Sequence, residues 1–443
     1  MKLTLKILAA VLLLLTVLIL FQLPKLDIIS GYAAKYMASG VHLTDRSPGD
    51  ITNNDFQVPL IKYADAEIKE SSEKARGAVF GLADRYAICR DGQGCVLVHE
   101  DFGERENWLV PRRDRRPHSL PYPFGTLTPR DTVFPEIDYK IVEKAVEHAF
   151  SNNDKQRTRT LLILYKDRII AERYADGIDK NTPVLGWSMT KSILSTLYGI
   201  MQEKGVLNIE DQADIKEWQG DDRSQITLKN LLQMQSGLEW EEDYTKISDV
   251  TKMLFFDADM TQAQRDKELQ APPGTKWNYS SGTSNLLSGL LRNYFDSDQE
   301  YLDFPYSALI DRIGMHSMLI ETDWEGNFVA SSYAWATTRD WGKFGLLYLH
   351  RGEWNGERIF DPSWIDFIST PVPDSEGQYG GHFWLNRGKT YPNAPADLYS
   401  ANGYQGQHVF IIPSHDMVIV RTGLAETPEF DADGFFNVLF KAF

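Results

Sequence analysis

Basic residues and cysteines are both scarce in this sequence. Its 443 residues carry 46 Lys and Arg against 62 Asp and Glu, which gives a formal net charge of −16. Phosphate binding needs a basic surface, so this charge argues against nucleic acid as a partner. The two cysteines, Cys89 and Cys95, cannot build a disulfide framework. They are close enough in sequence to pair in an oxidising compartment, and pairing and two free thiols are both open.

Metal-ligand spacing is also missing. His382, His408 and His415 are scattered and do not follow the short intervals that zinc sites use. Asp257 and Asp259 are close in sequence but lack the setting of a catalytic carboxylate pair. We therefore expect no metal and no cofactor. The chain also has no internal repeat and no low-complexity tract.

One long hydrophobic run is present, from Ile7 to Phe21, interrupted only by Thr16 and preceded by Lys2 and Lys6. Such runs are signal-peptide cores or short membrane anchors. No clear Ala-x-Ala cleavage site follows, so we predict an uncleaved single-pass anchor, with secretion after signal cleavage as the alternative. The lysines before the run favour a cytoplasmic N-terminus. The N-terminal run would then lie in the inner (cytoplasmic) membrane, and the rest of the chain would lie in the periplasm or outside.

Three parts are predicted along the chain. Residues 1–29 form the membrane anchor or signal segment. Residues 30–130 have no clean period and end in a Pro- and Arg-rich stretch, which predicts an irregular N-terminal extension. Residues 131–443 form the main domain.

The main domain is predicted to contain an antiparallel sheet built from both of its ends. Apolar runs around the polar pair Lys166-Asp167 predict a hairpin over residues 161–174, and residues 407–412 and 417–422 predict a second pair of strands. Apolar residues at helical spacing predict helices over residues 138–150, 192–203, 227–237, 286–291, 340–348 and 435–443. The expected fold class is α+β: an antiparallel sheet flanked by helices, with an inserted mainly helical subdomain, plus the N-terminal membrane helix.

The pattern Ser188-x-x-Lys191 is the candidate catalytic motif. If it opens a helix, the two side chains lie one turn apart on one face. A serine hydroxyl needs a base to take its proton, and a buried lysine can be that base because desolvation lowers its pKa. The pattern recurs at Ser71 and Lys74, in a charged stretch typical of a solvated surface. Ser188 differs because it lies between the predicted hairpin and an apolar helix. That setting fits both a catalytic serine and a plain helix N-terminus.

Five stretches occur together in the order of the chain. They are Ser188-Met189-Thr190-Lys191, residues 231–238, Tyr279-Ser280-Ser281, residues 341–348 and Gly403-Tyr404-Gln405-Gly406-Gln407. Together they resemble the serine β-lactamase and penicillin-binding-protein superfamily, on its class C branch. The sequence is most similar to the 6-aminohexanoate-dimer hydrolase and carboxylesterase-like members, over residues 130–443. No single motif is decisive, but five in register are specific.

The resemblance implies a role for each matching position. Ser188 would be the acylated nucleophile, and Lys191 would take its proton. Tyr279 would relay a proton to the leaving group. The N–H of Gln407, just after Gly406, would complete the oxyanion hole with the N–H of Ser188.

Two positions depart from the β-lactamase pattern. Ser281 stands where those enzymes have Asn, and Tyr404 stands where they have Lys or His. In β-lactamases these groups hold the amide and the carboxylate of the substrate, so acyl transfer is implied but β-lactam hydrolysis is put in doubt. Ser281, Tyr404 and Gly406 remain predicted substrate-binding positions. Tyr244 is a further candidate for the cleft, although a surface aromatic explains it nearly as well.

We therefore expect a serine hydrolase that cleaves a small ester or amide through an acyl-enzyme. One alternative is a β-lactamase or peptidoglycan DD-peptidase. Another is a non-catalytic member of the fold that binds a ligand or assembles with itself. The set Ser188, Lys191 and Tyr279 argues against that second alternative, because a pure binder does not need all three. The natural substrate and the oligomeric state stay open.

Overall fold

The computed structural model describes residues 2–69, 74–99, 102, 107–426 and 429–443, without the side chains of residues 2, 3, 9–12 and 14–23. Ser71, in the second Ser-x-x-Lys match, lies outside these residues. The chain divides into two compact units. The N-terminal unit comprises residues 1–90, 95–104 and 241–258, and the main unit comprises residues 91–94, 105–240 and 259–443.

The N-terminal unit consists of helices and an antiparallel sheet with the strand order β1-β2-β3-β4. Its elements are α1 (Lys2–Thr44), α2 (Pro48–Asn54), β1 (Ala64–Lys69), β2 (Lys74–Val79), β3 (Leu82–Arg90), β4 (Gly94–Val98) and α7 (Asp249–Phe256). The described residues between 30 and 98 thus lie mainly in helices and strands, where the sequence predicted an irregular segment over residues 30–130. The strands escaped prediction because β2 packs on α1 through small residues such as Ala75 and Gly77, which give no hydrophobic alternation. A Cβ at Gly77 would stand 2.1 Å from the carbonyl oxygen of Ser30.

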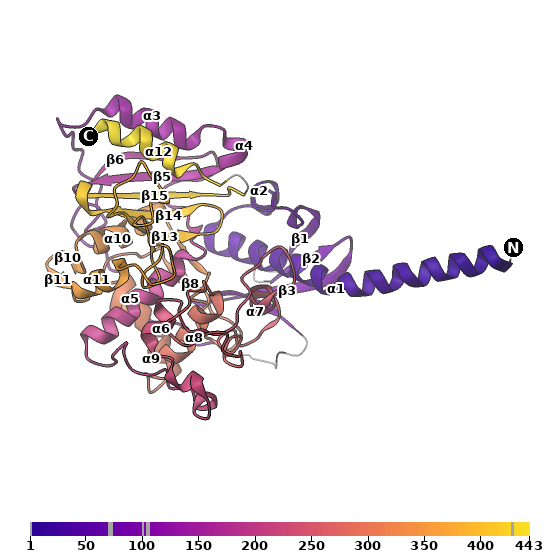
Figure 1. Ribbon diagram of the computed structural model, residues 1–443. Helices are drawn as coiled ribbons and strands as arrows, with labels where there is room; N and C mark the ends of the chain where they lie inside the picture. The colour runs from indigo at the N-terminus through magenta and orange to yellow at the C-terminus, as the bar shows by residue number, and fades with distance from the viewer. Residues whose placement is uncertain (1, 70–73, 100–101, 103–106, 427–428) are drawn as a thin grey trace. The chain divides into compact units, whose positions relative to one another are not determined.

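Helix α1 continues through the predicted boundary at residue 29 (Figure 1). Within the part of the chain that the structure describes, none of the helices is both long enough and apolar enough to span a membrane. Most side chains of the run from Ile7 to Phe21 lie outside the described ones. The membrane helix in the expected fold class thus stays a prediction.

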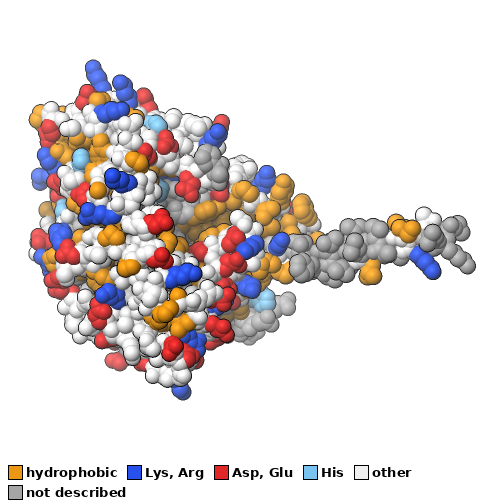
Figure 2. Space-filling view, in the orientation of Figure 1, with side chains coloured by type: hydrophobic (Ala, Val, Ile, Leu, Met, Phe, Trp, Pro, Cys, Tyr) orange, Lys and Arg blue, Asp and Glu red, His pale blue; other side chains and the backbone are white. Residues whose placement is uncertain are grey.

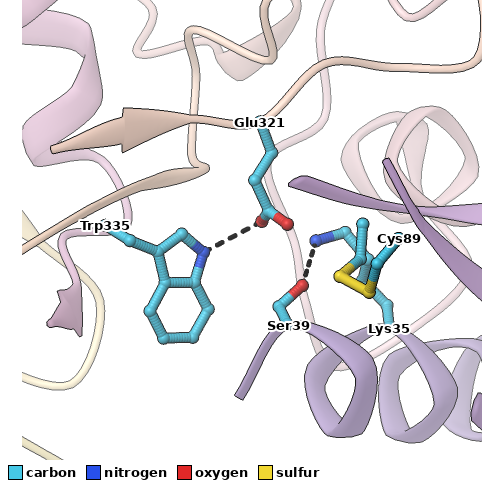
Figure 3. The surroundings of a disulfide bond; sticks show 6 residues. Lys35, Ser39, Cys89, Glu321 and Trp335 are labelled. Carbon is cyan, nitrogen blue, oxygen red and sulfur yellow. Dashed lines mark hydrogen bonds between the residues drawn. A yellow bond between two sulfur atoms is a disulfide. The ribbon is translucent and has the colours of Figure 1, made fainter. Parts of the chain in front are cut away.

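The open question of the two cysteines is settled by the structure, in which Cys89 and Cys95 form a disulfide between β3 and β4. Figure 3 shows the disulfide beside Lys35 and Ser39 of α1, whose side chains are joined by a hydrogen bond of 2.8 Å from Nζ to Oγ. Separately, in the main unit, the same view shows Trp335 Nε1 donating to Glu321 at 2.9 Å. Disulfides form and persist mainly in oxidising compartments, such as the periplasm or the outside of the cell.

The main unit is built on a six-stranded antiparallel sheet in the order β12-β13-β14-β15-β5-β6, so strands from both ends of the domain pair as predicted. Its strands are β5 (Thr158–Tyr165), β6 (Arg168–Tyr174), β12 (Trp384–Leu385), β13 (Tyr399–Gly403), β14 (Gln407–Ile412) and β15 (Met417–Gly423). The turn between β5 and β6 is the predicted pair Lys166-Asp167, with φ of 45° and 60°. Positive φ angles at both central residues are what a two-residue hairpin turn of type I′ requires.

Helices cover both faces of this sheet (Figure 1). Residues of β5 alternate between two cores, as a strand requires. Leu161 and Ile163 pack with α3 (Tyr139–Phe150) and α12 (Ala432–Leu439), whereas Leu162 and Leu164 pack with α5 (Met189–Glu203) and α10 (Thr338–Leu349). The α+β class with helices flanking an antiparallel sheet is thereby confirmed.

The segment between β6 and β12 is mainly helical. It contains α5, α6 (Leu228–Leu232), α8 (Ser281–Arg292), α9 (Asp298–Pro305), α10, α11 (Ser363–Ser369) and a small sheet of β7 (Val184–Leu185), β9 (Ala334–Ala336) and β8 (Leu319–Ile320). The helix predicted to reach residue 237 ends at Leu232. Met234 and Gly237 have positive φ angles of 58° and 77°, which a right-handed helix does not accept.

Candidate active site

Ser188 lies where the small sheet passes into α5. It is the N-cap residue of this helix, and its hydroxyl makes no capping bond. The segment before it is held by β9, since Gly186 N–H donates to the Ala334 carbonyl at 2.8 Å. Trp187 has a φ of 47°, in the left-handed region that bulky side chains rarely adopt. Unusual backbone of this kind persists only where the surroundings impose it, and here it precedes the candidate nucleophile.

Lys191 is 1% exposed, and its Nζ lies within hydrogen-bond distance of three oxygen atoms. Its Nζ is 2.8 Å from the Ser331 carbonyl oxygen, 3.0 Å from Ser281 Oγ and 3.2 Å from Ser188 Oγ. Two of these three distances join Lys191 to parts of the chain that sequence spacing does not relate to it. The predicted Ser188–Lys191 contact is therefore present, and it belongs to a larger cluster.

Ser281, which the resemblance predicts to bind substrate, is fully buried at the start of α8. In the structure its hydroxyl accepts a hydrogen bond from Lys191. The helix start is fixed by the preceding Ser280, whose Oγ accepts from the Thr283 N–H at 2.9 Å. Ser331, a residue that sequence reasoning missed, is held in turn by Asn285 Oδ1 at 3.0 Å from its N–H.

Tyr279 lies in the loop just before α8, and its ring faces Lys191, with Nζ 5.0 Å from the ring centroid. The ring belongs to an aromatic cluster formed with Trp277, Tyr379 and Trp384. The centroid of Tyr279 is 5.8 Å from that of Tyr379 and 5.4 Å from that of Trp384. The structure thus brings Tyr279 to the Ser188–Lys191 pair and adds an aromatic wall. That wall comes from segments about a hundred residues apart, for which the sequence gave no signal.

The β13–β14 turn approaches the segment that precedes Ser188, and the closest approach is at Gly403. A Cβ there would stand 2.1 Å from the Gly186 carbonyl oxygen, so only glycine fits. The next residue, Tyr404, has its ring centroid 5.7 Å from that of Trp187, and its hydroxyl donates to Glu426 at 2.7 Å. Partial burial and the Glu426 carboxylate raise the pKa of Tyr404 above its usual range, so its phenol stays protonated.

Gln407 stands opposite Gly403 in the strand ladder, and its buried side chain points to β15, donating to the Gly423 carbonyl at 2.6 Å. Gly406 has a φ of 75°, and a Cβ there would meet Arg421 at 2.5 Å. Arg421 is fully buried and donates to the carbonyls of Gln405 and Gly406 at 3.1 and 2.8 Å. Gly406 therefore shapes the turn together with Arg421, a positioning residue that the sequence did not reveal.

A buried histidine also lies behind α5. His382 Nδ1 is 2.6 Å from the Leu232 carbonyl oxygen and its Nε2 is 3.0 Å from Ser284 Oγ. Burial lowers the pKa of His382 to about 3, so the ring is neutral at pH 7. Its carbonyl accepts from Ser192 Oγ at 2.8 Å, which ties α5 to this segment. His382 thus supports the helix that carries Ser188.

Tyr244 belongs to the N-terminal unit, where its exposed side chain donates to Glu242 at 3.0 Å. Its predicted place in the cleft stays a prediction. In the described part of the chain, no group of three or more His, Cys, Asp or Glu side chains is placed to hold a metal ion.

The main unit thus combines an antiparallel sheet covered by helices on both faces with Ser188 and Lys191 at the start of a buried helix. A family model described as Beta-lactamase matches residues 146–438, and the chain belongs to this family.

Several of the proteins that this chain is similar to are named as hydrolases. The chain is 22% identical over 353 residues to a 6-aminohexanoate-dimer hydrolase of Paenarthrobacter ureafaciens, covering 72% of this chain and 82% of that protein. Among solved structures, it is similar to a candidate 6-aminohexanoate-dimer hydrolase of Bacillus anthracis, with a TM-score of 0.57, 22% identity and coverage of 65% and 79%. It is also similar to EstCE1, a hydrolase with promiscuous acyltransferase activity, with a TM-score of 0.54, 13% identity and coverage of 68% and 97%. At these identities the structural likeness concerns the fold.

Proposed function

We propose that this protein hydrolyses a small ester or amide through an acyl-enzyme formed on Ser188. The observation that carries the proposal is the arrangement around Lys191. A neutral lysine amine has two N–H donors and one lone pair. If the two N–H groups donate to the Ser331 carbonyl and Ser281 Oγ, the lone pair faces Ser188 Oγ at 3.2 Å. The amine is then oriented to take the serine proton.

In the proposed reaction, Ser188 Oγ attacks the substrate carbonyl while its proton passes to Lys191. The leaving group departs with a proton supplied through Tyr279, and water then releases the acyl group by the same steps in reverse. EstCE1, as a hydrolase with acyltransferase activity, is a relative by fold whose named activity fits an acyl-enzyme.

Two backbone N–H groups would stabilise the oxyanion. That of Ser188 precedes the hydrogen-bond ladder of α5, where helix N–H groups lack helical partners. The sequence predicts the N–H of Gln407 as the other oxyanion donor. The close approach of Gly403 to Gly186 favours the N–H of Tyr404 as a second candidate, since it follows Gly403 directly.

The substrate class is proposed from what lies beside Tyr279. The aromatic side chains of Trp277, Tyr379 and Trp384 offer an apolar wall, and the groups that grip a β-lactam, Asn and Lys or His, are replaced by Ser281 and Tyr404. A short, uncharged acyl group with an ester or amide bond suits such a site. The named substrate of the Paenarthrobacter relative, a dimer of 6-aminohexanoate, is joined by a linear amide bond.

A substrate panel tests this proposal. We expect the purified chain to hydrolyse short acyl esters of nitrophenol, with kcat/KM for a chromogenic cephalosporin lower by about 10²-fold, because each unpaired polar group of a substrate costs about 1–3 kcal/mol. Steady-state kinetics on both substrates and on a short linear amide supply the comparison. Cephalosporin turnover as efficient as that of the best ester would favour the β-lactamase alternative.

For the compartment, we propose that the run from Ile7 to Phe21 anchors the chain in the inner membrane with the main unit in the periplasm. The lysines at positions 2 and 6 and the disulfide of Cys89 and Cys95 support it.

A reporter joined to the C-terminus separates the possibilities. Alkaline phosphatase, active only after export, should be active in the fusion, and β-galactosidase, active only in the cytoplasm, should not. The chain should resist carbonate extraction from membranes. An active β-galactosidase fusion would contradict the topology, and a fully soluble chain would contradict the anchor.

A further inference from the structure

The sheet of the N-terminal unit ends in an apolar tip that faces solvent. Four large apolar side chains make up this tip: Leu60 is 54% exposed, Tyr63 52%, Phe80 74% and Leu82 52%. Val79 pairs with both Ala64 and Leu82, so the two segments that carry the tip meet at one end of the sheet. The rings of Tyr63 and Phe80 are 6.3 Å apart between centroids.

Two of the four tip residues have a strained backbone conformation. Leu60 and Phe80 have φ of 73° and 52°, in the left-handed region where glycine or asparagine would be less strained. A large apolar side chain exposed to water in a strained conformation gains nothing for folding. Exposed apolar side chains with a strained backbone are typical of a site that binds another molecule or a membrane.

The position of the tip along α1 follows from three contacts. A Cβ at Gly31 would stand 3.9 Å from Arg85 Cζ, and Arg85 pairs with Gly77, which packs on Ser30. Four residues further along β3, Cys89 lies beside Lys35 and Ser39 (Figure 3). Strand β3 therefore runs in the same direction as α1, and its first residues lie toward the N-terminal end of the helix.

The rise per residue of a helix and of a strand shows which residues of α1 lie level with the tip. Leu82 is three residues before Arg85, which is about 10 Å along a strand. The same distance along a helix is about seven residues, which leads from Gly31 to the region of Lys25. The apolar run of α1 ends at Phe21, so the tip lies close to the level where that run stops. Figure 2 shows hydrophobic side chains gathered on one side of the molecular surface.

We propose that this tip, formed by Leu60, Tyr63, Phe80 and Leu82, inserts into the headgroup and acyl boundary of the lipid bilayer that the N-terminal run enters. Apolar and aromatic groups at this depth lie roughly 5–10 Å into the boundary. Lys62, whose Nζ is 5.3 Å from the Tyr63 ring centroid, and Lys25 supply cations for anionic headgroups. The inference rests on the anchor proposed above, and it adds a second contact that fixes the N-terminal unit against the membrane surface.

A spin label in the full-length chain tests the tip. The variant Phe80→Cys is labelled with a nitroxide, with the native cysteines paired in their disulfide, and reconstituted in vesicles containing phosphatidylethanolamine and phosphatidylglycerol. We expect the accessibility of the label to a water-soluble nickel chelate to fall about threefold or more relative to detergent-free protein without lipid, and its accessibility to oxygen to rise. The matched control is Val206→Cys, which is 47% exposed in the main unit and should not change.

The outcomes separate the tip from the anchor and from the hydrolase. A chain that floats with vesicles while the label stays open to nickel would overturn the tip and leave the anchor standing. A chain that does not float would overturn both. A label that is protected without lipid would assign the tip to a second copy or a protein partner and overturn the lipid contact. Ester hydrolysis by the same samples reports on Ser188 independently.

Discussion

Replacing Ser188 with Ala is expected to abolish labelling by a fluorophosphonate probe and to lower kcat by about 10⁴-fold or more, which is typical for the loss of a catalytic serine. The side chain makes no capping bond to α5, so its removal should leave the fold intact. The melting temperature should therefore stay close to that of the wild type. A loss of activity without loss of stability assigns the effect to chemistry.

The matched control is Ser71→Ala, which removes the serine of the second Ser-x-x-Lys match. We expect this variant to label and to turn over as the wild type does. Peptide mapping of the probe adduct by mass spectrometry identifies the modified residue directly. An adduct on Ser71, or labelling that survives in Ser188→Ala, would refute the assignment of the nucleophile.

Replacing Lys191 with Met is expected to remove hydrolysis of every substrate, because no other group is proposed to take the proton of Ser188. Met keeps the length of the side chain in a site that is 1% exposed and thus limits the cavity. Tyr279→Phe should behave differently. A phenolate such as nitrophenol leaves without a proton, whereas an amide nitrogen must be protonated first. General acid help is worth about 10²–10⁴-fold, so this variant should lose that factor on amides and far less on nitrophenyl esters.

The comparison needs kcat/KM for one amide and one nitrophenyl ester in each variant. Tyr379→Phe serves as control, since Tyr379 shares the aromatic wall with Tyr279 and has no proposed proton to move. The variant Tyr379→Phe should change kcat/KM by the same factor for the amide and for the nitrophenyl ester. Equal losses on both substrates in Tyr279→Phe would mean that Tyr279 activates or positions Ser188, and the proposed division of roles would be wrong.

Local patterns were sufficient for the elements that bracket the site. The polar pair Lys166-Asp167 between apolar runs predicted the β5–β6 hairpin, and helical spacing after Ser188 predicted α5. These patterns work because turn chemistry and side-chain periodicity depend on neighbours within a few residues. Helix α6 was predicted too long, because the left-handed backbone of Met234 is imposed by surrounding structure and leaves no local signal.

The sheet of the N-terminal unit was missed for a related reason. Its strands pack on α1 through close backbone contacts at small residues, such as Gly77 on Ser30, so the alternation that marks a half-buried strand is absent. The pairing of Cys89 and Cys95 likewise required β3 and β4 to be neighbours, and that relation comes from the hairpin as folded.

By itself, the sequence determined the α+β class, the strands at both ends of the main domain, and the spacing that brings Ser188 within reach of Lys191. Only the tertiary structure decided what surrounds the lysine. Ser281 and Ser331 are separated from it by 90 and 140 residues along the chain, and both lie within 3.0 Å of its Nζ. The aromatic wall, the buried Arg421 under the β13–β14 turn and the level of the apolar tip on α1 arise in the same way. Each of these features depends on contacts between segments that are distant in sequence. The pattern of residues within one segment does not show which other segment it will contact.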